Sequence, residues 1–365
     1  MFKRQKQKAG DNSQQIQAGV VNCYSGIDEE RARQIVEERV PEIIQNYSIE
    51  AYDIAEERIN YFTNNLIPEL VNNELLEWLK NPSIQVLISD AQKTAISTER
   101  EADYELLSEL IIHRINKEDD RNSRTGIKRA VQIVDEISNE ALLGLTVAQV
   151  AMGFVPMSGG IDEGLNIFSN SFEKIIYGEL PEGYLWIEQL DILDALRMNQ
   201  MSSFMKSREF LSNKFSGYLD VGISKTSENY SKAIELLNEA HLPLDLLITH
   251  ELRSGYVRLN IYNINNIDNI VFFKLDQFGK IQTQDFLTEN QQESLKKIYD
   301  LYEDGIILRE ENIDRFMKKW DSYKRLKEFR EWWDALPVSF SVTSVGRVLA
   351  HSNAKRCDPN LPDFN

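Results

Sequence analysis

The apolar residues near the start of the chain recur at the three- and four-residue steps of an α-helix. Asp28 opens this pattern with a side chain that can accept hydrogen bonds from the first backbone N–H groups of a helix. Pro41 lies inside the run and predicts a kink or a split, because proline lacks a backbone donor. The spacing places a series of apolar residues on one face of the predicted helix: Val36, Val40, Ile43, Tyr47, Ala51 and Ile54.

A second apolar seam follows Pro82 and predicts one long helical stretch from residue 84 to residue 111. Its small members allow another helix to come close, so packing within one bundle is the favoured interpretation and an intermolecular coiled coil is the alternative. Residues 127–137 predict a shorter amphipathic helix. Residues 141–157 predict a buried helix, too short for the roughly 20 residues of a membrane span, and residues 180–200 predict one more helix. The seam comprises Ile84, Ile88, Ala91, Ala95, Thr98, Ala102, Leu106, Leu107, Leu110 and Ile111.

The pattern changes beyond residue 250. Two runs rich in β-branched and aromatic residues, 256–262 and 270–275, predict a β-hairpin with an Asn-rich loop between its strands. Helices are predicted at 290–303 and 310–334, and a last short strand at 338–343.

These elements predict a mainly α fold in two parts. A helical bundle domain is expected over residues 26–200. A smaller α+β domain, for which a winged-helix-like form is one arrangement, is expected over residues 232–365. Residues 201–231 are the expected connection, because eight serines lie between Ser202 and Ser231. The length of 365 residues also favours two domains.

Residues 1–25 differ from the rest of the chain in being rich in Gln, Asn, Ser and Gly. Within residues 10–22, apolar and polar residues alternate with the period of a β-strand. One glutamine-rich strand is not stable alone, so we predict that copies from neighbouring subunits pair and form a homo-oligomer. A plain polar tail is the alternative. The residues predicted to mediate assembly are Asp11, Asn12, Gln15, Ile16, Gln17 and Val20.

The composition limits the classes of ligand. A formal net charge of −17, from 41 basic and 58 acidic residues, does not indicate a general nucleic-acid-binding surface, although a local basic patch remains open. Two cysteines and four histidines exclude a disulfide scaffold and are few for a zinc site, so neither a metal nor a cofactor is expected. The basic residues 3–8 are not followed by an apolar stretch, so we expect a soluble, cytoplasmic protein without a membrane span.

The chain contains no strong catalytic motif. Arg347 and His351 are the weak candidates, because they stand four residues apart on a predicted helix. They loosely resemble the Arg/His pair of the HEPN ribonucleases, whose motif has at least four residues between the two where this chain has three. A surface pair is the favoured interpretation, and a non-enzymatic protein is favoured over an enzyme.

Two separate blocks resemble the Abi-alpha (abortive infection alpha) family. Residues 98–111 resemble its acidic, leucine-paired helix, with residues 127–142 as the amphipathic helix that follows. Residues 340–350 resemble its closing strand, Gly-Arg and helix signature. The phrase at residues 10–19 departs from that family and is similar to one in uncharacterised bacterial proteins, some of them near phage-defence genes. The resemblance implies a bacterial protein of defence type and supplies no active-site residues.

The expected function is therefore a non-enzymatic oligomeric sensor or scaffold in bacterial phage defence, acting with a phage or host protein. The alternative is a ribonuclease or another effector enzyme whose site forms only in the fold or across subunits. In that alternative, Arg347 and His351 carry the chemistry.

Overall fold

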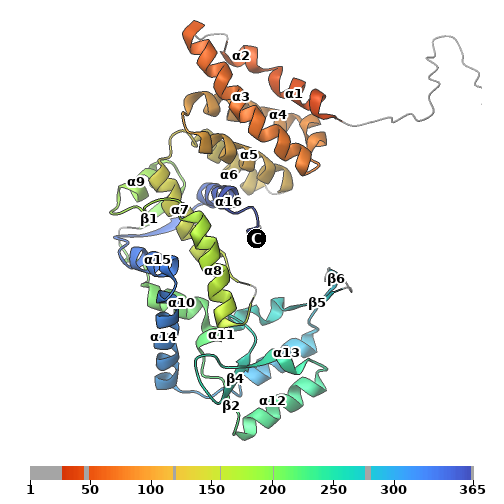
Figure 1. Cartoon of the computed structure of the whole chain (residues 1–365), viewed down its shortest axis with the longest axis vertical. Coiled ribbons are helices and arrows are strands. Elements are labelled where there is room, and N and C mark those ends of the chain that lie inside the picture. Colours follow the sequence, from red (N-terminus) through yellow and green to blue (C-terminus); the bar gives the residue numbers. More distant parts are fainter. Residues whose placement is uncertain are drawn as a thin grey trace, which may run out of the picture.

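A computed structural model describes residues 27–44, 49–117, 121–156, 158–199, 201–275 and 281–362. The chain is mainly helical with a few short strands, so the predicted fold class is confirmed (Figure 1). Among the described helices, none is both long enough and apolar enough to cross a membrane.

The first helices form the upper part of the molecule in Figure 1. Asp28 caps the first of them by accepting a hydrogen bond from the Arg31 backbone N–H at 2.8 Å, as predicted. The predicted break near Pro41 is also confirmed, because a new helix begins at Val40 and places the proline in its first turn, where no backbone donor is needed. These helices are α1 (Glu29–Glu37), α2 (Val40–Ile44), α3 (Ile49–Asn72), α4 (Pro82–Ser97), α5 (Glu101–Asn116) and α6 (Arg121–Gln132), with a 3₁₀ turn η1 (Leu76–Lys80) before α4.

The predicted continuous helix from residue 84 to residue 111 is wrong at its centre. The chain leaves the helix at Thr98 and re-enters it at Glu101. Thr98 binds the local chain instead of continuing the helix, because its hydroxyl contacts the Asp103 carboxylate and accepts from the Arg100 backbone N–H at 3.1 Å. Two separate helices in contact with each other, α4 and α5, result.

The buried helix predicted over residues 141–157 is confirmed as α7 (Asn139–Gly153), which is buried from Ala141 to Ala151. The helix predicted over residues 180–200 is correct only in its central part. The helix α9 (Leu185–Ile192) ends in a turn at Asp194, which has a φ of 63°, and a strand β1 (Leu196–Asn199) follows. Between α7 and α9 lies α8 (Ile161–Ile175).

The predicted β-hairpin is wrong in its pairing. The strand β4 (Tyr256–Leu259) pairs with β2 (Ile223–Ser224) and β3 (Leu247–Thr249), whereas β5 (Val271–Leu275) pairs with β6 (Ile281–Phe286). The expected loop contains a 3₁₀ segment, η3 (Ile264–Asn269), which the Asn263 side chain caps by accepting from the Asn265 backbone N–H at 2.9 Å. A composition that favours β-structure indicates a strand, but it does not specify the strand with which it pairs.

Further helices precede and follow these strands along the chain. They are α10 (Ser207–Lys214), α11 (Ser216–Leu219), α12 (Glu228–Glu239), a 3₁₀ turn η2 (Leu244–Leu246), α13 (Glu289–Tyr299), α14 (Ile306–Asp321) and α15 (Lys324–Asp334). The last strand, β7 (Ser339–Val342), pairs antiparallel with β1 and confirms the strand predicted near residue 340.

The last helix returns to the bundle. The sequence predicts that α16 (Ser344–Cys357) lies in the carboxy-terminal unit, but α16 packs against α5, α6 and α7 (Figure 1). Gly346 permits this return, because a Cβ there would lie 1.9 Å from the Ala195 carbonyl oxygen. The division into a domain of residues 26–200 and a domain of residues 232–365 stays a prediction. The last helix of the second range, α16, packs against helices of the first.

The buried apolar residues of the described chain form a large core, a smaller core and a small cluster of Ala55, Ile59 and Ile96. The large core runs through the bundle, α8 and α14–α16, and it includes Phe215 and Tyr218 of the serine-rich stretch. The smaller core lies between α12, α13 and the sheet of β2, β4 and β3. The expected connection at residues 201–231 is therefore packed in part against the large core.

Candidate functional site

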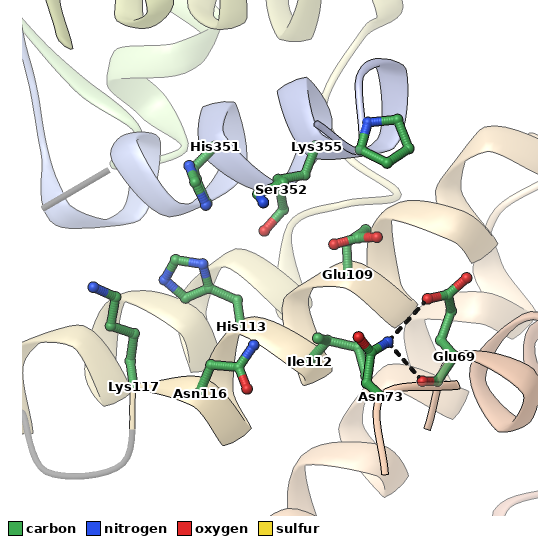
Figure 2. Close-up of a pocket in the computed structure, with 11 residues that line it drawn as sticks. Glu69, Asn73, Glu109, Ile112, His113, Asn116, Lys117, His351, Ser352 and Lys355 are labelled. Atoms are coloured by element: carbon green, nitrogen blue, oxygen red, sulfur yellow. Dashed lines mark hydrogen bonds between the residues drawn. The ribbon is translucent and has the colours of Figure 1, made fainter. Parts of the chain in front are cut away.

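A polar pocket of about 220 Å³ lies between α3, α5 and α16 (Figure 2). Asn116 and Pro359 are exposed, so the pocket reaches the surface of the molecule. Its walls hold both acidic and basic side chains together with two of the four histidines of the chain. The lining residues are Glu69, Asn73, Glu109, Ile112, His113, Asn116, Lys117, His351, Ser352, Lys355 and Pro359.

Helical spacing brings the polar side chains of each wall together. On α5, Glu109, His113 and Asn116 follow steps of four and three residues, so they share one face of the helix. Leu110 and Ile111, on other faces of the same helix, are buried in the large core. α16 repeats the arrangement, because His351 and Lys355 stand four residues apart and line the same pocket.

The two histidines meet across the pocket. The ring centroids of His113 and His351 lie 5.0 Å apart, and the ring planes are inclined by 71°, which is an edge-to-face contact. His351 has only 4% of its surface exposed, whereas His113 is half-buried. The fold therefore joins two imidazoles that come from α5, in the first third of the described chain, and from α16, its last helix (Figure 2).

The α5 wall of the pocket has an acidic end and a basic end. Figure 2 shows Glu109 toward one end of this wall, and His113 and Lys117 toward the other. Glu69 extends the acidic end from α3, where its carboxylate accepts from the Asn73 side-chain amide at 3.3 Å. The imidazole rings thus lie nearer to Lys117 than to Glu69 (Figure 2).

Ser352 is the least exposed polar residue of the pocket, at 1%. Its hydroxyl has no hydrogen-bond partner. Buried serines in the other helices usually donate to the carbonyl oxygen four residues earlier, as Ser108 does to Tyr104 at 2.9 Å and Ser294 to Asn290 at 3.0 Å. Other buried side chains of the described chain, among them Thr63 and Ser216, also lack a hydrogen-bond partner, so the orphaned hydroxyl of Ser352 is distinguished by its place in the wall of the pocket.

A protein-family model matches residues 26–362, which is nearly the whole chain. The chain belongs to this family, whose function is uncharacterised. No curated protein and no solved structure matches the chain. The pocket lies entirely within the residues that the family model covers.

Arg347 and His351, the two residues that the sequence proposed as a weak catalytic pair, lie one turn apart on α16, but only His351 lines the pocket. Arg347 is exposed and does not line the pocket, whereas His351 is buried in its wall. The predicted pair is therefore not assembled at this pocket. The residues predicted to mediate assembly all lie outside the described residues: Asp11, Asn12, Gln15, Ile16, Gln17 and Val20.

The sequence motifs did not single out His113, Glu109 or Ser352 as site residues. A usable signal was present, because histidine is rare in this chain and His113 follows Glu109 by one helical turn. The contact between α5 and α16 carried no local signal, since it depends on how the last helix returns to the bundle. Within the described part of the chain, no three His, Cys, Asp or Glu side chains are grouped so that they could hold a metal ion.

A larger groove, of about 980 Å³, lies between the segment after α8 and α15. Five glutamates, Glu140, Glu179, Glu182, Glu328 and Glu331, line it beside Trp332 and two prolines. Its charged lining residues are all carboxylates, whereas the smaller pocket combines imidazole, ammonium, carboxylate and hydroxyl groups. The smaller pocket is therefore the better candidate for chemistry.

Proposed function

We propose that the protein is an acid–base enzyme that cleaves RNA in the pocket between α3, α5 and α16. The observation that carries this proposal is the edge-to-face contact of His113 and His351, 5.0 Å apart, in a polar pocket that reaches the surface. Histidine is the side chain that most often transfers protons in enzymes, because its ordinary pKa lies near neutral pH.

Two imidazoles suffice for the proton transfers of RNA cleavage. A neutral imidazole removes the proton of a ribose 2′-hydroxyl, and the oxygen forms a bond to the adjacent phosphorus. The bond from phosphorus to the 5′ oxygen then breaks, and the second imidazole, which is protonated, gives its proton to that oxygen. The products are a 2′,3′-cyclic phosphate and a 5′-hydroxyl, and proton exchange with water restores the two rings.

The lysines and the size of the pocket also support RNA as the substrate. Lys117 and Lys355 line the pocket and bring positive charge to the place where negative charge builds up on the phosphate oxygens. A volume of about 220 Å³ is below the roughly 300–1,000 Å³ of pockets that enclose a drug-sized ligand. The pocket therefore suits one unit of a longer strand.

Cleavage of a defined single-stranded RNA by the purified full chain tests this proposal. We expect the wild type to cleave it and to leave a DNA strand of the same sequence intact, because DNA lacks the 2′-hydroxyl. His113→Ala and His351→Ala are each expected to lower the rate by at least about 100-fold, the usual contribution of one acid or base.

His241→Asn is the matched control for these variants. His241 is exposed, is not in the pocket, and has a positive φ of 52° that asparagine tolerates. The control is expected to cleave RNA at the wild-type rate. Wild-type protein without RNA cleavage, equal cleavage of the DNA strand, or pocket variants as active as His241→Asn would each overturn the proposal.

The resemblance to the Abi-alpha family supports a setting in bacterial phage defence. In that setting the enzyme is the effector of an abortive-infection response. The non-enzymatic oligomeric sensor or scaffold stays a prediction, as do the homo-oligomer and the phage or host protein partner. A wild-type protein that cleaves no RNA would make the sensor or scaffold the better proposal.

A further inference from the structure

We infer that the pocket binds a ribonucleotide by its phosphate at the end formed by His113, His351 and Lys117, and that the Ser352 hydroxyl donates a hydrogen bond to the bound phosphate. The choice of a ribonucleotide rests on the proposed function. Binding of the phosphate itself does not, because it is argued from the charges and hydrogen-bonding groups of the pocket.

The unpartnered hydroxyl of Ser352 supports the binding of a phosphate. Ser352 is 1% exposed, its hydroxyl has no partner within the protein, and the residue lines the pocket between His351 and Lys355 along α16. Figure 2 shows its side chain on the face of α16 that is turned toward α5. A phosphate oxygen in the pocket is the kind of acceptor that this donor lacks.

The position of the positive charge supports binding of the phosphate at the end of the pocket that holds the two histidines. Lys117 lies just past the end of α5, on the side of the pocket that holds the two rings (Figure 2). A phosphate at this end has an ammonium group and two imidazole rings around it. Charge-assisted hydrogen bonds from such groups to phosphate are roughly twice as strong as neutral ones.

The opposite end of the pocket limits what else the ligand carries. Glu109 and Glu69 place two carboxylates there (Figure 2). Carboxylates repel a second phosphate but accept hydrogen bonds from hydroxyl and amino groups. The ligand is therefore expected to carry a single phosphate together with hydrogen-bond donors, which a ribose and an amino-bearing base supply.

Binding can be observed without any turnover. The four histidines of the full chain, labelled with ¹³C at the ring carbon between the nitrogens, give a separate NMR signal each. Titration with inorganic phosphate is expected to shift the signals of His113 and His351 and to leave those of His241 and His250 in place. Cytidine 3′-monophosphate is expected to bind at least about fivefold more tightly than phosphate, and its 2′-deoxy counterpart more weakly than the ribonucleotide.

Two variants test the proposed contacts. Ser352→Ala and Lys117→Gln are each expected to weaken phosphate binding at least about fivefold. Lys128→Gln is the matched control, because Lys128 is exposed on α6 and lies outside the pocket. Unchanged circular dichroism and unchanged signals of His241 and His250 establish that each variant is folded.

The results separate this inference from the proposed function. Phosphate binding that depends on Ser352 and Lys117, in a protein that cleaves no RNA, supports the inference and overturns the enzyme. The inference would be overturned if phosphate did not shift the signals of His113 and His351. It would also be overturned if Ser352→Ala and Lys117→Gln bound phosphate as tightly as the wild type, or if Lys128→Gln weakened phosphate binding as much as these two variants. Equal affinity for phosphate and for the ribonucleotide would overturn the assignment of a ribonucleotide as the ligand and would leave only the assignment of a phosphate site.

Discussion

His250 and His351 are almost equally buried, with 2% and 4% of their surfaces exposed, but their surroundings differ. His250 lies between β3 and β4, where the Leu252 backbone N–H donates to its Nδ1 at 3.2 Å. Since Nδ1 accepts, Nε2 carries the proton and donates to the Asp220 carbonyl oxygen at 3.0 Å. Both nitrogens of the neutral ring are thus used within the protein.

His351 packs instead against a second imidazole in the wall of a pocket. The next residue, Ser352, has a buried hydroxyl without a partner. Burial of a histidine therefore does not by itself indicate function. The fold uses both ring nitrogens of His250, whereas it leaves a donor unused beside His351, and a bound group can use that donor.

The largest expected effect concerns His250 and the stability of the fold in mild acid. Burial, with Arg258 as the next cause, lowers the pKa of His250 from 6.5 to about 4. Because the folded pKa is below the unfolded one, the contribution of the neutral ring is fully present above pH 6.5 and is lost as the pH falls toward 4. The difference corresponds to about 3 kcal/mol of unfolding free energy.

Urea unfolding between pH 7 and pH 4.5 measures this effect. His250→Gln, which cannot gain a proton, is expected to lose less stability over that range than the wild type, by about 2 to 3 kcal/mol. The NMR signal of His250 is expected to stay at its neutral position down to pH 5. An equal loss of stability in wild type and variant would show that His250 does not set the acid sensitivity.

A smaller effect of opposite sign is expected at Ser352. Ser352→Ala removes a buried hydroxyl that has no partner, and an unsatisfied group of this kind costs about 1 kcal/mol or more. The variant is therefore expected to unfold with a free energy about 1 kcal/mol higher than that of the wild type. Urea denaturation at pH 7 measures the change.

Ser108→Ala provides the matched control. Ser108 is 2% exposed and lies in α5, but its hydroxyl donates to the Tyr104 carbonyl oxygen at 2.9 Å. Its removal is expected to leave stability unchanged or to lower it by up to about 1 kcal/mol. If Ser352→Ala destabilises the fold as much as Ser108→Ala, then the hydroxyl of Ser352 is satisfied in the folded protein.

Local patterns in the sequence predicted the helices well, because the spacing of apolar residues reports directly which face of a helix is buried. The cap at Asp28 and the break near Pro41 followed from the chemistry of single residues. The pairing of β4 and β5 did not, since a strand-forming composition is compatible with several partners.

The sequence predicts the two walls of the candidate site separately, but not that they come together. Glu109 and His113 share a face of α5, and His351 and Lys355 share a face of α16, by helical spacing alone. Nothing local indicates that these two faces meet. That contact depends on the return of the chain through β7, whose register with β1 sets Val342 opposite Leu196, and on the close approach of Gly346 to Ala195.

The most direct test of the two-histidine site is the pH dependence of kcat/KM for RNA cleavage. A neutral imidazole as base and a protonated imidazole as acid predict a bell-shaped profile for the wild type. His113→Ala and His351→Ala are each expected to keep only one limb of the bell, the two variants losing opposite limbs, with rates at least about 100-fold lower. A wild-type profile without a maximum, or one that both variants reproduce, would contradict the account.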